Sequence, residues 1–153
     1  MELLKRGIAA LLAALCLFLT ACGSKDYGPP PDLTGTWGML PDDANWHFVA
    51  KINDDVVHVM WYQPFEKRAY LYWEGTFTPP EDGKEPYSWD STTMHTVEEL
   101  ESSNLYNRAT REQTKTFTYK DGKISFLVTS GYLRMAYVLE RGYEYEEYEE
   151  LRE

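Results

Sequence analysis

The sequence predicts an all-β domain, an antiparallel meander of seven or eight strands with one short helix. From Leu33 onward, apolar and polar residues alternate with a period of two, as in strands that bury one face. Turn signals such as Asp121-Gly122 separate the alternating segments. Two architectures satisfy this pattern, a closed up-and-down barrel and a sandwich of two sheets.

The N-terminal segment has the composition of an export signal. Two basic residues precede an uncharged run from Gly7 to Ala21, which is shorter than the about 20 apolar residues that a membrane-spanning helix needs. The run ends in Leu19-Thr20-Ala21-Cys22, which resembles the lipobox of bacterial lipoproteins. That resemblance implies that residues 1–21 are a lipoprotein signal peptide and that Cys22 carries a diacylglyceryl lipid. The alternatives are an ordinary secretory signal and an uncleaved anchor.

The lipobox resemblance also implies a location, the extracytoplasmic face of the cell membrane, with the membrane as a partner through the lipid. Cys16 lies in the segment that is removed, so the remaining chain has no disulfide and depends on its core for stability. Residues 22–32 include three consecutive prolines and are predicted to form an extended tether. At about 3.1 Å per residue, such a tether would hold the domain roughly 30 Å from the lipid.

The remaining chain divides into a β-domain, residues 33–142, and an acidic tail, residues 143–153. The net charge of −10 would repel phosphate backbones, so we expect no nucleic-acid partner. Six of the tail residues are glutamates, and their mutual repulsion predicts a tail that stays in solvent. The alternative is a tail that binds a basic partner.

The first part of the domain is predicted to be a strand followed by a hairpin. The strand covers residues 34–39, and the hairpin turns at Asp54-Asp55. This turn places Ile52 opposite Val57, and it makes the shared face of the hairpin apolar. It also places His47 opposite Tyr62 and His58 opposite Lys51 on the outward face.

The middle of the domain is predicted to add two strands and the helix. In the first strand, the inward set is Leu71, Trp73, Gly75 and Phe77, and the outward set is Tyr70, Tyr72 and Glu74. The second strand covers residues 87–91. The helix begins at Thr96, because Thr96-Val97-Glu98-Glu99 matches a capping box.

The end of the domain is predicted to form two more hairpins. A turn at Asp121-Gly122 pairs Tyr119 with Ile124, Phe117 with Phe126 and Lys115 with Val128. A weaker turn at Ser130-Gly131 pairs Val128 with Leu133, Phe126 with Met135 and Ile124 with Tyr137. Both turns bring mostly apolar partners to one face, which supports the register.

The candidate binding surface is the outward set Tyr62, Tyr70 and Tyr72. Tyrosine gives rigid amphipathic contact area, and neighbouring strands would gather these side chains into a patch. Cross-strand tyrosines also stabilise an exposed sheet, and this is the simpler explanation of the pattern.

Motifs for catalysis are missing from the sequence. His47, His58 and His95 are the only histidines, and the predicted pairing sets the first two on different rungs, so we expect no metal site. The paired carboxylates lie at turns and at the helix start, where they have local roles. Only Glu74 and Asp90 lie beside a tryptophan. We therefore expect no enzyme, and no cofactor beyond the lipid on Cys22.

One resemblance concerns the first strand. Leu33-Thr34-Gly35-Thr36-Trp37 contains the Gly-x-Trp that opens the first strand of lipocalins and lipocalin-like proteins. In that family, a basic residue from the end of the last strand covers the tryptophan at the closed end of the barrel. Arg141 is the matching residue here, so Trp37 and Arg141 are the expected closing pair. The alternative function that follows is a carrier or sensor of a small apolar ligand, which needs an open interior.

A second resemblance covers more of the chain. The segments "LYWEGTF" at 71–77, "KTFTYKDGKISFLV" at 115–128 and "VLER" at 138–141 are similar to small lipoproteins of actinobacteria and of their temperate phages. Prophage-encoded lipoproteins often act at the cell surface to block entry of a second phage. The resemblance thus implies a non-enzymatic binding lipoprotein that acts in superinfection exclusion, with a phage or envelope protein as its partner.

Overall fold

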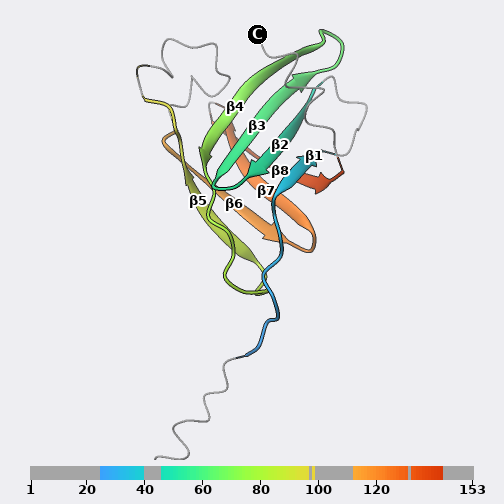
Figure 1. The fold of residues 1–153 in the computed structure, drawn as a ribbon. Helices are drawn as coiled ribbons and strands as arrows, with labels where there is room; N and C mark the ends of the chain where they lie inside the picture. Colours follow the sequence, from blue (N-terminus) through green and yellow to red (C-terminus); the bar gives the residue numbers. More distant parts are fainter. Residues whose placement is uncertain (1–24, 40–45, 97, 99–111, 131, 143–153) are drawn as a thin grey trace, which may run out of the picture.

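The eight strands of the chain form one antiparallel sheet that curls into a nearly closed barrel (Figure 1). The computed structural model describes residues 25–39, 46–96, 98, 112–130 and 132–142. The strands are β1 (Gly35–Gly38), β2 (His47–Asn53), β3 (Val56–Gln63), β4 (Arg68–Thr76), β5 (Tyr87–Thr92), β6 (Thr114–Lys120), β7 (Lys123–Ser130) and β8 (Leu133–Arg141). The sheet order is β4-β3-β2-β1-β8-β7-β6-β5. The predicted all-β meander is confirmed, and of the two architectures it is the barrel.

Two turns set the register of their hairpins as predicted. Asp54-Asp55 pairs Ile52 with Val57, and Asp121-Gly122 pairs Phe117 with Phe126. Asp121 and Gly122 have φ angles of 50° and 78°. Positive φ at both central residues is the requirement of a type I′ turn, whose twist matches that of the strands.

The predicted register of β7 against β8 is wrong by two residues. Ser130 pairs with Leu133, so Ser130 belongs to β7 and is not part of the predicted Ser130-Gly131 turn. A shift of two keeps every side chain on its face, and the inward set of β7 is unchanged. The shift places Leu139, which is fully buried, opposite Ile124, and it moves Leu133 out to the exposed tip of the hairpin.

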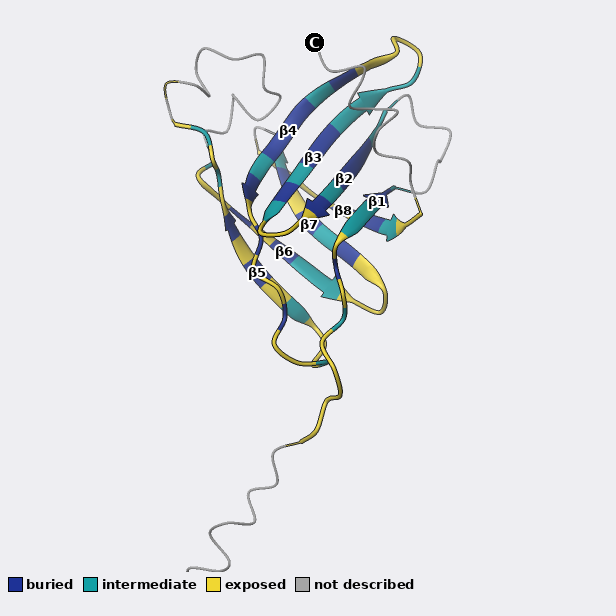
Figure 2. Ribbon diagram, viewed as in Figure 1, coloured by how far each residue is buried: buried dark blue, intermediate teal, exposed yellow. Residues whose placement is uncertain are grey.

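The interior of the barrel is filled mainly by aromatic side chains. Figure 2 shows that the buried residues alternate along the strands. The ring of Phe126 lies near the centre, with its centroid 5.3 Å from that of Phe48 and 5.4 Å from that of Phe117. Trp89 stacks on Phe117 at 5.2 Å. Ring pairs at these distances add to the free energy gained from burial.

A bulge in β4 changes which side chains face inward. Val59 pairs with Trp73 while Met60 pairs with Leu71, so Tyr72 is an extra residue on β4. Tyr72 and Trp73 consequently both belong to the interior cluster. Leu71, predicted inward, instead packs on the outer face. A bulge shifts the alternation by one residue, which is the reason why the predicted faces of this strand fail before Trp73.

At the seam between β4 and β5, an isolated bridge joins Gly75 to Thr93, and Met94 donates its backbone N–H to the Glu74 carbonyl oxygen at 3.0 Å. Trp73 donates its indole N–H to Ser91 Oγ across the seam at 2.9 Å. A β-carbon at Gly75 would lie 2.5 Å from Ser91 Oγ and 2.6 Å from the Thr92 carbonyl oxygen. Only glycine allows the two strands to approach this closely.

Several predicted features lie outside the described residues. They are the signal peptide 1–21, the lipidation site Cys22, most of the helix that was expected to begin at Thr96, and the tail 143–153. Among the residues that are described, none belongs to a helix long and apolar enough to cross a membrane.

We predict that Gly122→Val destabilises the domain by about 1–2 kcal/mol, because a β-branched residue is strained at positive φ. Urea unfolding measures the change. Asp121→Asn is the control, since Asn-Gly suits the same turn. Equal stability of Gly122→Val and the wild type would contradict the assigned turn.

Candidate functional site

One end of the barrel is closed by the predicted pair Trp37 and Arg141. The two residues are opposite each other in the β1–β8 ladder, and the guanidinium carbon of Arg141 lies 4.5 Å from the centre of the Trp37 rings. Arg141 also donates hydrogen bonds to the carbonyl oxygens of Thr34, at 2.8 Å, and Asp32. These contacts fasten the entering chain across the barrel end, which we call the tether end.

The predicted tether is only partly a free spacer. Gly83, in the loop between β4 and β5, donates its backbone N–H to the Gly28 carbonyl oxygen at 3.0 Å. The ammonium of Lys84 lies 5.8 Å from the centre of the Tyr27 ring. The chain is therefore attached to the tether end from Tyr27 onward, so residues 27–32 of the predicted tether are part of the folded domain.

The three candidate tyrosines do not form one outward patch. Tyr62 packs on the outer face of the sheet, beside the buried cluster of Val49, Met60, Ala69 and Leu71. Tyr70 lies against Trp61, with ring centroids 5.7 Å apart. Tyr72 is 3% exposed inside the barrel. The expected surface is wrong, because the bulge in β4 turns Tyr72 inward.

Two of the histidines meet a carboxylate that the sequence did not connect with them. Glu74 lies opposite His58 in the β3–β4 ladder. Its two carboxylate oxygens lie 3.5 Å from His58 Nδ1 and 2.8 Å from His95 Nε2. The described part of the chain contains no group of three or more histidine, cysteine, aspartate or glutamate residues placed to hold a metal ion. The arrangement ties β3, β4 and the segment after β5 together.

The most unusual feature is a break in the ladder between β6 and β7. The two strands pair from Lys120 and Lys123 as far as Phe117 and Phe126, and no pairing beyond this point is found among the described residues. Lys115 is therefore not opposite Val128 as predicted. Its ammonium instead donates to the Leu127 carbonyl oxygen, at 2.9 Å. A side chain thus takes the place of the missing backbone bonds.

Lys115 is a buried cation, with a side chain only 2% exposed. Glu112 Oε2 lies 2.5 Å from its Nζ, and the rings of Tyr72 and Trp73 lie 5.1 and 5.4 Å from it. Burial disfavours the charged form and lowers the pKa of Lys115, and the bond to Glu112 opposes that shift. These partners are needed because an unpaired ammonium would be costly at this depth.

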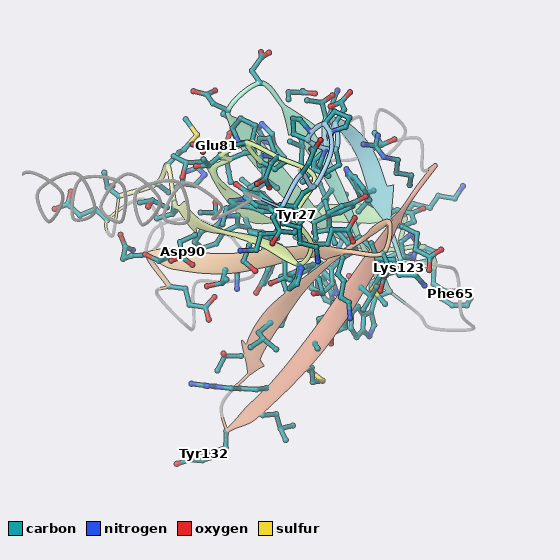
Figure 3. The ribbon with its side chains drawn as sticks, turned by 90° about the horizontal axis from the view of Figure 1, so that it is seen from below. Tyr27, Phe65, Glu81, Asp90, Lys123 and Tyr132 are labelled. Carbon is teal, nitrogen blue, oxygen red and sulfur yellow. The ribbon has the colours of Figure 1, made fainter. Side chains whose placement is uncertain are left out.

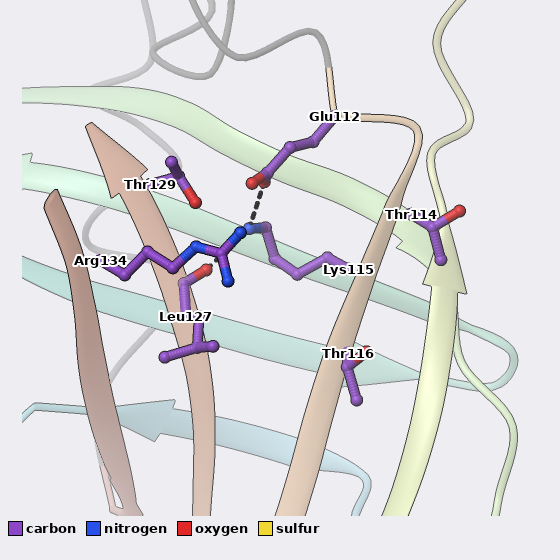
Figure 4. Close-up of a pocket in the computed structure, with 7 residues that line it drawn as sticks. All are labelled: Glu112, Thr114, Lys115, Thr116, Leu127, Thr129 and Arg134. Atoms are coloured by element: carbon purple, nitrogen blue, oxygen red, sulfur yellow. Dashed lines mark hydrogen bonds and ion pairs between the residues drawn. The ribbon is translucent and has the colours of Figure 1, made fainter. Parts of the chain in front are cut away.

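A pocket of about 180 Å³ opens where β6 and β7 separate. It is lined by Glu112, Thr114, Lys115, Thr116, Leu127, Thr129 and Arg134 (Figure 4). Arg134, on β8, extends over β7 towards the end of Lys115. Two cations and one carboxylate therefore meet in a chain whose net charge is −10. An anionic group fits this local excess of positive charge.

Beyond the break, the β7–β8 hairpin projects from the barrel wall, and Tyr132 marks its tip (Figure 3). The exposed large apolar residues of the hairpin are Leu127, Tyr132, Leu133, Met135 and Val138. They lie on both faces, since Leu133 and Met135 share the face of Tyr137, and Leu127 shares that of Val138. Exposed apolar side chains gathered in this way are typical of a binding surface. Sequence reasoning missed this surface, because it assumed that β6 supports β7 along its whole length.

No protein-family model, no curated protein and no solved structure matches the chain. The resemblances to lipocalins and to actinobacterial and phage lipoproteins accordingly stay predictions. The observations that bear on function are the gap between β6 and β7 and the projecting hairpin.

We predict that Lys115 gives stability a distinct pH dependence. Between its lowered pKa and its ordinary value of 10.5, the unfolded chain binds a proton that the folded chain has lost. The free energy of unfolding should therefore rise with pH in this window, relative to that of Lys115→Met. Lys120→Met, which removes a cation whose side chain is 65% exposed, is the control. Parallel stability curves for the wild type and Lys115→Met would contradict the burial of the ammonium.

Proposed function

We propose that the chain is a non-enzymatic binding lipoprotein, anchored through Cys22 to the extracytoplasmic face of the cell membrane. Its partner is a protein of an incoming phage or of the cell envelope, and its role is superinfection exclusion. The lipobox supports the anchor, and the resemblance to phage lipoproteins supports the role. The observation that carries the binding function is the projecting β7–β8 hairpin with its exposed apolar side chains.

The hairpin is a better candidate surface than the rest of the sheet. Leu133 is 66% exposed and Met135 is 40% exposed, although both lie on the face that is buried further along β8. Burial of such side chains against a partner would contribute about 25 cal/mol per Å² of apolar surface. Solvent exposure of these residues has no benefit for the isolated barrel, which is the physical reason to assign them to a partner.

The attachment of the tether supports the orientation that binding requires. Tyr27 and Gly28 are held by the loop between β4 and β5, so the predicted tether is limited to the residues before them, and an extended segment of that length would span roughly 15 Å at about 3.1 Å per residue. The loop that holds the tether lies at the end of the barrel where β7 begins, since Glu85 accepts a hydrogen bond from the Asp121 N–H. The tether end therefore faces the membrane, and the hairpin tip is presented at the opposite end.

A carrier of a small apolar ligand is the alternative from another class, and the interior gives it little support. The ring centroid of Phe126 lies 5.3 Å from that of Phe48, 5.4 Å from that of Phe117 and 6.1 Å from that of Tyr137, and the rings of Phe48 and Tyr137 lie 4.9 Å apart. The nearby Trp89 Nε1 is buried without a hydrogen-bond partner among the described residues. One such N–H could bind a water molecule, but a ligand pocket requires hundreds of cubic ångströms.

We predict that Cys22→Ala abolishes incorporation of labelled lipid and releases the protein from the membrane, because the thiol is the acceptor of the lipid. Cys16→Ala is the matched control and should leave labelling intact. Metabolic labelling with a fatty acid, followed by membrane fractionation, measures both. Lipid incorporation into the Cys22→Ala form would rule out the anchor.

We predict that expression in a susceptible host lowers the plating of some phages while adsorption persists. Tyr132→Ser with Leu133→Ser should restore plating, since it removes apolar contacts from the hairpin tip. Surface changes of this kind alter the free energy of unfolding by only about 0.5 kcal/mol. Phe65→Ser is the matched control, because Phe65 is 81% exposed on the turn between β3 and β4.

Two results would contradict this role. Unaffected infection across a broad phage panel would exclude superinfection exclusion. Full protection by the Tyr132→Ser, Leu133→Ser variant, at wild-type protein levels, would exclude the hairpin tip as the binding surface.

A further inference from the structure

The gap between β6 and β7 leaves a strand edge unpaired among the described residues. This edge bears on how the partner binds, an inference that rests on the proposed binding function. β7 continues to Ser130 and β6 begins at Thr114, yet their ladder ends at Phe117 and Phe126. The facing edges of 114–116 and 127–130 have no strand between them in the described part of the chain. Free edges present backbone N–H and C=O groups that another strand can pair with.

The groups on the β7 edge can be identified. The Leu127 carbonyl points into the gap, because it accepts the bond from Lys115. In a regular strand, the N–H and C=O groups that point to one edge belong to alternate residues. Thr129 therefore presents its N–H and C=O to the same edge, whereas Val128 faces Met135 on β8. Leu127 and Thr129 both line the pocket.

Lys115 occupies part of this edge in the folded protein. Its ammonium occupies one acceptor, the Leu127 carbonyl, and Glu112 balances its charge. A charged side chain directed at an edge is one of the means by which proteins prevent indiscriminate strand pairing. An entering strand would replace the bond to Leu127, and Lys115 would keep its ion pair with Glu112.

The positive charge at the gap would favour a partner strand that carries a carboxylate. Arg134 and Lys115 outnumber Glu112, so the gap is locally positive (Figure 4). A strand with a carboxylate beside Arg134 gains a charge-assisted hydrogen bond, and a basic strand meets like charge. Leu127 and Val138 offer apolar contact on the same face of the hairpin.

We propose that the partner binds by strand addition: an extended segment of alternating polar and apolar residues, with a carboxylate near its centre, pairs with the edge of β7 at Leu127 and Thr129. The backbone bonds supply affinity, and the contact with Arg134 supplies selectivity.

The experiment uses the purified mature protein and three fluorescent peptides. The first peptide alternates valine and threonine around a central glutamate, the second has lysine at the centre, and the third is the first with its pairing amides N-methylated. Fluorescence anisotropy should show binding of the glutamate peptide, roughly tenfold weaker binding of the lysine peptide, and no binding of the methylated one.

Variants locate the site on β7. Thr129→Pro removes the edge N–H and should abolish binding, while it keeps the bonds of Val128 to β8, because proline is tolerated at a strand edge. Thr129→Val keeps the N–H, loses only the hydroxyl, and should bind as the wild type does. Arg134→Gln should erase the preference for the glutamate peptide.

The outcomes are decisive in both directions. Binding that needs the Thr129 N–H and prefers glutamate supports the proposal. No binding of any peptide, equal binding of the methylated peptide, or binding that survives Thr129→Pro would overturn it. A wild-type dimer that Thr129→Pro dissociates, as seen by light scattering, would show that a second copy is the occupant and would also overturn it. Phage protection that depends on Tyr132 and Leu133 without peptide binding would leave the proposed function standing and remove only strand addition.

Discussion

The far half of the barrel depends on one interaction, the pairing of the buried Lys115 ammonium. A cation with a side chain 2% exposed is stable only where partners replace its lost hydration. Glu112, the Leu127 carbonyl and the rings of Tyr72 and Trp73 supply them. These partners come from β4, from β7 and from the segment before β6, so one side chain joins three parts of the wall. It also holds β6 and β7 at the point where their backbone ladder ends.

The two ends of the barrel consequently have different characters. At the tether end, Arg141 stacks on Trp37 and binds the carbonyl oxygens of the entering chain, and ordinary ladders hold the strands together. At the far end, the ladder between β6 and β7 is replaced by the bond of a side chain, and the β7–β8 hairpin leaves the wall. The entering chain is thus held at the closed end of the barrel, and the free strand edge lies at the opposite end.

The sequence predicts this fold well wherever a turn fixes the register. Asp54-Asp55 and Asp121-Gly122 correctly predict the residue pairs nearest to them, because a two-residue turn allows only one register between its strands. Ser130-Gly131 misleads by two residues, since its signal is weak and both registers bury the same face of β7. The bulge at Tyr72 and the end of the β6–β7 ladder leave no local signal. Both features depend on how the nearly closed sheet curves, which no local motif reports. The sequence alone therefore assigns Lys115 to a ladder position opposite Val128 and the three tyrosines to one surface patch.

The central claim is that β7 has a free edge beyond Phe126, and amide hydrogen exchange of the folded protein tests it most directly. Ser125 and Thr129 point their N–H groups to the same edge of β7, one inside the ladder with β6 and one beyond its end. The account predicts that the Ser125 amide is protected and that the Thr129 amide exchanges nearly as fast as an exposed amide. Equal, strong protection of both amides would contradict it.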